Sequence, residues 1–233
     1  MADDGNAPDG SQPSLTRVHW QRLRRMYRSA GWPYLDPIEL DLLAAGLLER
    51  REGTETVHLT EAGIEALAKQ RKSNQNAYNG HAALIQRMAR QLMVGGRICY
   101  SELSLRARLE SGWKRVRPDL FSIRRTSRED RLVPEVHEIK VRRSDLLGEL
   151  RATEKRLAYE ALSTRCYFVL AQGIGEPDEI PEPWGIWIVE KEGGLCLARE
   201  AARRNTRLDF GAWMALAQAT PIKGHDEAEQ QHF

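Results

Sequence analysis

Three charged residues in the middle of the chain have types and spacing that suit chemistry on a phosphate. Asp119 follows Arg117 and Pro118, and Glu138 and Lys140 are two residues apart in the short segment 135–141. That segment alternates in polarity, which predicts a strand. The alternation puts Val136, Glu138 and Lys140 on one face and His137, Ile139 and Val141 on the other.

Unlike charges on one face of a buried strand are costly unless an ion completes the site. Asp119 and Glu138 are hard oxygen ligands suited to Mg²⁺ or Mn²⁺, which keeps several waters and binds a phosphate oxygen. Lys140 is a compact positive charge that would stabilise the charge developing on the phosphate. We therefore expect Asp119, Glu138 and Lys140 to be catalytic, with Asp119 and Glu138 as the metal ligands.

These residues resemble the active-site signature of the PD-(D/E)xK nuclease superfamily. The signature is present here as Pro118-Asp119, a spacer, and Glu138-Ile139-Lys140. The chain from about residue 81 to 202 also resembles the MmcB-like DNA-repair nucleases of this superfamily. That match is carried by the following segments: Ser144–Leu147 (SDLL), Tyr167–Val169 (YFV), Gly185–Val189 (GIWIV), Gly193–Leu195 (GGL) and Leu197–Ala201 (LAREA).

The resemblance implies an α/β fold with a restriction-endonuclease-like core, a mixed central sheet flanked by helices. It also implies metal-dependent cleavage of DNA. The first helix of the match, 81–94, lacks the acid that the superfamily usually has there, which leaves the number of metal ions open. Glu102, in the region before the first motif strand, is a candidate third acid, and a surface or salt-bridged Glu is the alternative.

Basic residues are the candidates for contact with a nucleic acid, because Lys and Arg neutralise phosphates. The helix expected over residues 14–30 carries five arginines and no acid. A helix expected over 144–162 would begin at Ser144 as N-cap and point free N–H groups at a phosphate beside Lys140. A merely solvated charged face is the alternative for each candidate. The nucleic-acid-binding candidates are Arg17, Arg22, Arg25, Arg117, Arg143, Ser144 and Lys155.

The N-terminal region predicts a separate small domain. Residues 1–13 lack apolar periodicity and are expected to be disordered. Residues 14–73 then suggest a helix over 14–30 and a second over 38–48, which Asp36 opens as N-cap with Pro37 at the first helical position. Short strands near 48–51 and 57–59 and a helix over 60–72 are expected to follow. The phrase LTEAG at 59–63 resembles the end of many winged-helix domains, which predicts a DNA-binding module over 14–73. A helical packing or dimerising module is the alternative.

The remaining segments complete the expected organisation. An Asn-rich stretch predicts a linker at 74–80, and residues 81–220 should form the nuclease-like domain, with a flexible tail at 221–233. The helix expected over 144–162 should bury Leu146, Leu147, Leu150, Leu157 and Ala161. Metal binding by the tail residues His225 and His232 is not expected, since nothing holds them in place.

Composition limits the compartment and the class of protein. The chain has 233 residues, 41% of them hydrophobic, and a net charge of only +2. Cys99, Cys166 and Cys196 are far apart, match no CxxC or Cys/His zinc spacing, and are expected to be reduced thiols. The sequence has no apolar run that would span a membrane or direct secretion. A cytoplasmic protein without a membrane partner is the expectation.

Two classes of function follow. The leading hypothesis is a Mg²⁺- or Mn²⁺-dependent DNA endonuclease that acts in DNA repair or in defence against foreign DNA. The alternative is a non-catalytic winged-helix DNA-binding regulator with a decayed nuclease fold. An RNA substrate is a third hypothesis. Cutting both strands usually needs two sites, which leaves a homodimer as an open alternative to a monomer.

Overall fold

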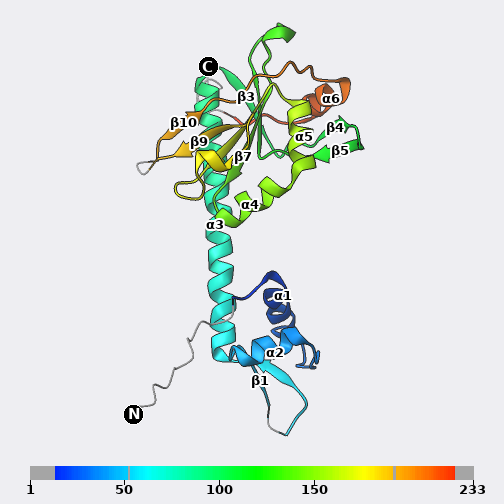
Figure 1. The fold of residues 1–233 in the computed structure, drawn as a ribbon, viewed down its shortest axis with the longest axis vertical. Coiled ribbons are helices and arrows are strands. Elements are labelled where there is room, and N and C mark those ends of the chain that lie inside the picture. The colour runs from blue at the N-terminus through cyan, green and yellow to red at the C-terminus, as the bar shows by residue number, and fades with distance from the viewer. Residues whose placement is uncertain (1–13, 52, 191–192, 224–233) are drawn as a thin grey trace, which may run out of the picture. The chain divides into compact units, whose positions relative to one another are not determined.

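The computed structural model describes residues 14–51, 53–190 and 193–223. The chain divides into two compact units, Met1–Asn76 (unit 1) and Ala77–Phe233 (unit 2) (Figure 1). The expected disordered segment 1–13 and the tail histidines His225 and His232 lie outside the described residues.

Unit 1 contains helices and one small hairpin around an apolar core. Helix α1 (Arg17–Met26) precedes α2 (Pro37–Ala44), and β1 (Leu48–Arg50) pairs antiparallel with β2 (Val57–Leu59). The expected N-cap of α2 is confirmed, since the Asp36 carboxylate accepts from the Glu39 N–H at 3.0 Å and Pro37 is the first helical residue. The core is made by Leu23, Met26, Leu42, Leu47, Leu48 and Val57.

The LTEAG phrase has a clear packing role at the start of helix α3 (Glu61–Val94). The Thr60 hydroxyl accepts from the Gly63 N–H at 3.0 Å and donates to the Gly46 carbonyl at 2.7 Å. A Cβ on Gly63 would lie 2.2 Å from the Leu47 carbonyl oxygen, so only glycine allows the helix to pack this closely on the chain before β1.

Helix α3 is longer than the sequence predicts. Its 34 residues run without interruption through 74–80, where a linker was expected. The prediction that residues 74–80 form a linker without regular structure is therefore wrong, because they are helical. Asn and Gly, which make up most of this stretch, have low helix propensity, but the helical turns on either side supply the nucleus that such a stretch could not form alone.

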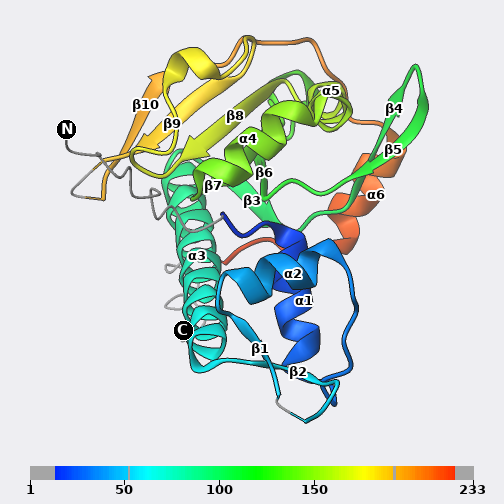
Figure 2. The ribbon, with the colours of Figure 1, turned by 60° about the horizontal axis from the view of Figure 1, so that its bottom comes forward.

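Unit 2 is built on a mixed six-stranded sheet, which confirms an α/β sheet flanked by helices (Figures 1 and 2). The strand order is β10-β9-β8-β7-β6-β3. Only the pairs β7–β8 and β8–β9 are parallel. The strands are β3 (Arg97–Ser101), β6 (Leu120–Arg124), β7 (Glu135–Lys140), β8 (Arg165–Leu170), β9 (Gly185–Val189) and β10 (Leu195–Arg199).

Helices cover both faces of this sheet (Figure 2). The second half of α3 packs Leu84, Met88 and Leu92 against Ile139 of β7. On the other face, helices α4 (Arg143–Arg151), α5 (Thr153–Leu162) and α6 (Phe210–Gln218) cover Val136 of β7. The expected alternation of β7 is confirmed, because Val136 and Ile139 belong to different cores.

Two predictions about unit 2 helices are wrong. One helix was expected over 144–162, but the chain breaks at Ala152 (φ −84°, ψ 63°) into α4 and α5. Of the side chains expected to be buried, Leu147 and Leu157 are 37% and 49% exposed, and Ala161 is exposed as well. The N-cap is Arg142, so Ser144 does not cap the helix, and its hydroxyl contacts Asp145.

The structure also contains elements that the sequence analysis did not predict. The basic stretch before Asp119 forms a second hairpin, β4 (Leu105–Leu109) and β5 (Gly112–Val116), which packs on α5 and α6. Two short 3-10 helices, η1 (Glu129–Arg131) and η2 (Pro177–Glu179), lie in the loops after β6 and β8. The tail expected from residue 221 begins as an ordered segment, since the Ile222 N–H donates to the Cys99 carbonyl at 2.8 Å.

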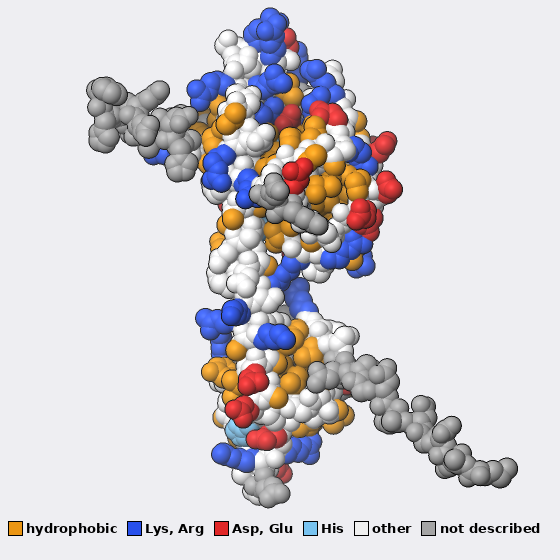
Figure 3. Space-filling model, turned by 90° about the vertical axis from the view of Figure 1, so that its left-hand side faces the viewer, with side chains coloured by type: hydrophobic (Ala, Val, Ile, Leu, Met, Phe, Trp, Pro, Cys, Tyr) orange, Lys and Arg blue, Asp and Glu red, His pale blue; other side chains and the backbone are white. Residues whose placement is uncertain are grey.

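The distribution of charged side chains on the surface and the state of the cysteines are as the sequence predicts. Lys and Arg side chains are intermixed with Asp and Glu on the face of each unit drawn in Figure 3, in keeping with a net charge of +2. Cys99, Cys166 and Cys196 are free. In the described part of the chain, no helix is long and apolar enough to cross a membrane.

Candidate active site

Neighbouring strands of unit 2 bring the three expected catalytic residues together. Asp119 immediately precedes β6, and Glu138 and Lys140 lie on β7, which pairs antiparallel with β6. Backbone groups fix the two acids: the Ile139 N–H donates to the Asp119 carboxylate at 2.8 Å, and the Asp119 N–H donates to Glu138 at 3.3 Å. Asp119 is half-buried, and Glu138 is 1% exposed.

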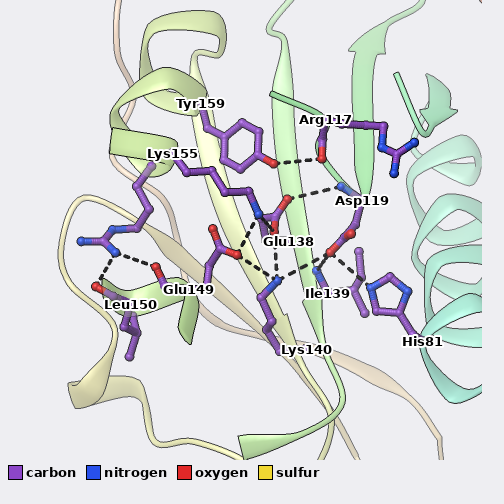
Figure 4. Close-up of polar contacts among 11 residues, drawn as sticks. His81, Arg117, Asp119, Glu138, Ile139, Lys140, Glu149, Leu150, Lys155 and Tyr159 are labelled. Atoms are coloured by element: carbon purple, nitrogen blue, oxygen red, sulfur yellow. Dashed lines mark hydrogen bonds and ion pairs between the residues drawn. The ribbon is translucent and has the colours of Figure 1, made fainter. Parts of the chain in front are cut away.

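Carboxylates and ammonium groups alternate around these residues (Figure 4). Lys140 Nζ lies 2.9 Å from Glu138 Oε2, 3.4 Å from Glu149 Oε2 and 3.8 Å from Asp119 Oδ2. Lys155 Nζ lies 3.1 Å from the same Glu138 oxygen and 2.8 Å from Glu149 Oε2. We call Asp119, Glu138, Lys140, Glu149 and Lys155 the charge cluster.

Burial and charge pairing act against each other in the charge cluster. Burial lowers the pKa of Lys140, but the charges of Glu138, Asp119 and Glu149 outweigh it, so this pKa lies above its ordinary value. Burial likewise lowers the pKa of Lys155, but the interactions with Glu138 and Glu149 raise it by more, so this pKa also lies above its ordinary value. Burial raises the pKa of Glu138, and Lys140 partly offsets that rise.

His81, near the middle of α3 and within unit 2, adds a partner to Asp119. Its Nε2 lies 3.3 Å from Asp119 Oδ2, and this hydrogen bond raises the pKa of His81. Burial raises the pKa of Asp119, but the hydrogen bond from His81 and the charge of Lys140 outweigh it, so this pKa lies below its ordinary value. Asp119 therefore remains a carboxylate at neutral pH.

The donor set fits a hard divalent cation, although it is not a closed metal site. No three His, Cys, Asp or Glu side chains of the described residues are grouped to hold a metal ion by themselves. Mg²⁺ needs no such cage, because it is commonly bound by one or two carboxylates with water and substrate phosphate. The cluster holds three carboxylates and two ammonium groups, and Glu149 Oε1 is buried without a hydrogen-bond partner. An unpaired buried carboxylate oxygen favours a further positive charge nearby.

Glu102 and Arg117 pair with each other instead of joining the charge cluster. Glu102 Oε2 lies 2.8 Å from Arg117 Nη1, with the two side chains 69% and 61% exposed. Glu102 thus has the surface, salt-bridged role that was the alternative to a third acid. The Arg117 backbone is held separately, because its carbonyl accepts from the buried Tyr159 hydroxyl at 3.0 Å.

The residues expected at the start of α4 have other contacts. Arg143 pairs with Glu179 of η2 and donates to the Ile174 carbonyl at 3.2 Å, which fastens the loop after β8 to this helix. Ser144 is exposed and near Asp145. Arg143 is therefore already paired with a carboxylate. Lys155, which was also expected to bind a nucleic acid, lies within the charge cluster.

The arginines of α1 fall into two groups. Arg22 is buried and forms two hydrogen bonds to Asp36, at 2.9 and 2.5 Å, while its guanidinium stacks 3.8 Å from the Tyr34 ring centroid. Arg22 therefore holds unit 1 together and is not free for a phosphate. Arg17 and Arg25 are exposed. Unit 1 also has a groove of about 880 Å³, which is lined by Arg24, Arg28, Arg71 and Lys72 together with apolar side chains such as Ile64 and Leu67. Neither Arg17 nor Arg25 lines it.

Sequence reasoning missed His81 and Glu149. His81 was only the first residue of an expected helix, and no spacing relates it to Asp119, which lies on another element. Glu149 could have been found from the local sequence, because it lies on α4, the helix that directly follows the motif strand β7. The assumed continuous helix over 144–162 concealed this signal, because the break at Ala152 brings Lys155 back to within 2.8 Å of Glu149.

Comparison with known proteins gives a structural similarity without a function. No protein-family model matches the chain, and no curated protein matches it either. Among solved structures, the chain is similar to the SPO1766 protein of unknown function from Silicibacter pomeroyi, with 19% sequence identity and a TM-score of 0.39. The similarity covers 62% of this chain and 82% of that chain.

Proposed function

We propose that the protein is a divalent-metal-dependent nuclease that hydrolyses phosphodiester bonds in DNA. The observation that carries the proposal is the convergence of Asp119, Glu138 and Lys140, with Lys140 Nζ 2.9 Å from Glu138 and 3.8 Å from Asp119. These are the residues that resemble the PD-(D/E)xK signature. The finer fold assignment, a restriction-endonuclease-like core, is part of the same proposal.

The residues would divide the work as follows. Asp119 and Glu138 would hold Mg²⁺ or Mn²⁺, which when bound lowers the pKa of an attacking water and neutralises phosphate charge. Lys140 would release part of its pairing with the carboxylates and stabilise the charge that develops on the phosphate. Glu149 and Lys155 would hold Lys140 and Glu138 in position.

Unit 1 would hold the nucleic acid. We propose a winged-helix-like module in which β1 and β2 form the small wing and the exposed Arg17 and Arg25 contact phosphates. The groove lined by Arg24, Arg28, Arg71 and Lys72 supports this role through its charge. Arg22 has no part in it, because Asp36 already satisfies its guanidinium.

One observation favours the alternative of a DNA-binding regulator without catalysis. Glu138 Oε2 already has two ammonium partners, Lys140 and Lys155, which could replace a metal ion instead of preparing for one. Both functions predict DNA binding, and only one predicts hydrolysis.

Incubation of the purified protein with a panel of nucleic acids separates the two functions. Plasmid, linear, single-stranded and branched DNA, and RNA, are each incubated with Mg²⁺, Mn²⁺ or EDTA and analysed for new ends. The nuclease proposal expects metal-dependent products from at least one DNA substrate and none in EDTA. Tight binding to DNA without products under any metal condition would instead support the regulator.

A further inference from the structure

The β4–β5 hairpin has two chemically different faces. Cross-strand partners in an antiparallel pair point to the same side of the sheet. Arg106 is opposite Arg115, and Arg108 is opposite Trp113. All four are exposed, and Trp113 is 58% exposed. We call this set the outer face of the hairpin.

The inner face is apolar and fixed to the core. Leu105, Ala107 and Val116 are buried against α5 and α6. Lys114, at the edge of this inner face, lies 2.7 Å from Glu154 of α5. The hairpin is therefore anchored through one face, and packing does not explain the composition of the other.

The outer face is unfavourable for a protein without a ligand. Two arginines directly opposite each other repel. In the ranges 14–51, 53–190 and 193–223 that the structure describes, no carboxylate pairs with Arg106, Arg108 or Arg115. Arg106 lies 5.6 Å from the centroid of the Trp113 ring, which holds the indole beside a cation. A polyanion would remove the repulsion.

The hairpin is also connected rigidly to the charge cluster. Strand β5 leads through Arg117 and Pro118 directly to Asp119. The Tyr159 hydroxyl on α5 holds the Arg117 carbonyl at 3.0 Å, and the same helix carries Lys155 of the cluster. The outer face is therefore carried by the strand that leads to the proposed metal ligand.

We propose that the outer face of the β4–β5 hairpin, which leads along the chain to Asp119, binds an unpaired strand of nucleic acid. Trp113 stacks on a base, and Arg106, Arg108 and Arg115 bind the adjoining phosphates. An exposed indole flanked by arginines suits an unpaired strand better than a duplex, because the faces of duplex bases are already covered by their neighbours. This inference rests on the proposed function and narrows its substrate to nucleic acid with a single-stranded segment.

Binding measured without metal tests the proposal independently of cleavage. The full chain is titrated in EDTA against fluorescent oligothymidylate and against the corresponding duplex, with fluorescence anisotropy as the readout. Trp113→Ala should weaken single-strand binding by about 5- to 150-fold, the equivalent of one stacked base, and duplex binding much less. Trp113→Phe should restore part of the affinity. Lys114→Ala is the matched control on the inner face and should change neither.

A second variant separates a ligand contact from a structural role. Arg115→Ser should also weaken single-strand binding and flatten its dependence on log salt by about 0.7 for one lost phosphate contact. The same substitution removes the repulsion with Arg106, so the thermal midpoint of the free protein should stay constant or rise. A lower midpoint together with unchanged binding would assign Arg115 to stability and overturn the proposal.

The outcomes distinguish this inference from the proposed function. Unchanged single-strand affinity in Trp113→Ala, or an equal loss on the duplex, would overturn the hairpin proposal even if the protein cleaves DNA. If Trp113→Ala weakens single-strand binding but the wild-type protein cleaves no substrate, the hairpin is supported as a binding surface. Only the nuclease proposal would then be contradicted.

Discussion

Lys140 and Lys155 share the carboxylates of the charge cluster, and this sharing sets what each residue can do. Glu138 and Glu149 each contact both ammonium groups. Removing one partner of a buried ion pair usually destabilises a protein strongly, because it leaves a charge uncompensated. Here the second lysine still compensates both carboxylates, so either lysine can be removed without leaving Glu138 unpaired.

Lys140→Ala should therefore fold but lose activity. Lys140 is not one of the proposed metal ligands, and losing a preorganised positive group at the developing charge lowers the rate by on the order of a hundredfold or more. Single-turnover cleavage measures the loss, and circular dichroism melts check the fold. Arg151→Ala is the control, since Arg151 is exposed at the end of α4. Cleavage by Lys140→Ala within a few-fold of wild type would show that Lys140 has no catalytic part.

The Arg143–Glu179 pair gives a prediction about pH. The hydrogen bond from Arg143 lowers the pKa of Glu179 from 4.5 to about 2. A carboxyl with a lowered pKa binds fewer protons in the folded than in the unfolded state, so its stabilisation is present above pH 4.5 and is lost as the pH falls toward 2. Carbon-detected NMR titration should find this low pKa, and Arg143→Gln should return it toward 4.5. An ordinary Glu179 pKa in the wild type would show that the pair does not form in solution.

At the residue scale, sequence predicted the part of the site that is local. Glu138 and Lys140 share a face because they are two residues apart on a strand. Asp119 was recognised from its Arg-Pro-Asp context, but its partner His81 comes from a helix that is distant in sequence. Only the packing of α3 on the sheet brings these two residues together, and no single-sequence pattern encodes that packing.

Helix α1 shows that residues of one type on one element can have opposite roles. Arg22 faces the core and holds Asp36, whereas Arg25 is exposed three residues later. Both were predicted to bind a nucleic acid because both are charged. The periodicity of the helix does not tell which of its arginines is buried against a carboxylate. Asp36 was expected as an N-cap, and its second role as the partner of Arg22 was not.

A matched pair of variants follows for unit 1. Arg22→Ala should lower the free energy of unfolding by on the order of 2 kcal/mol, because the Asp36 carboxylate loses its two hydrogen bonds from Arg22 and keeps the one from the Glu39 N–H. Arg25→Ala should change it by less than about 0.5 kcal/mol, as is usual at the surface. Urea denaturation of both variants provides the measurement. Equal stability of the two variants would contradict the structural role of Arg22.

The other elements were predicted as far as their signals were local. Strand β7 has a clear alternation of polarity, and α2 has a recognisable N-cap in Asp36. The break at Ala152 carries no Gly or Pro, so the sequence suggested one helix where the structure has two. The β4–β5 hairpin was missed because its outer face is basic, and a run of arginines resembles a loop more than a strand.

At the scale of the whole molecule, the proposal divides binding from chemistry between the two units. The exposed Arg17 and Arg25 belong to unit 1, and the charge cluster belongs to unit 2. The full-length double variant Arg17→Ala/Arg25→Ala should bind duplex DNA less tightly and flatten the plot of log affinity against log salt by up to about 1.8. Single-turnover cleavage at saturating DNA should remain close to that of wild type. An unchanged salt slope would rule out these arginines as phosphate contacts.

The central claim is that Asp119 and Glu138 hold the metal ion for hydrolysis. The most direct measurement is single-turnover DNA cleavage across a Mg²⁺ titration, for wild type, Asp119→Asn and Glu138→Gln. Each amide keeps the shape of the acid while removing the anionic ligand. We predict that wild-type cleavage rises with Mg²⁺ to a plateau and that both variants stay at the level seen in EDTA. Wild-type cleavage in EDTA, or a variant that follows the wild-type Mg²⁺ curve, would contradict the claim.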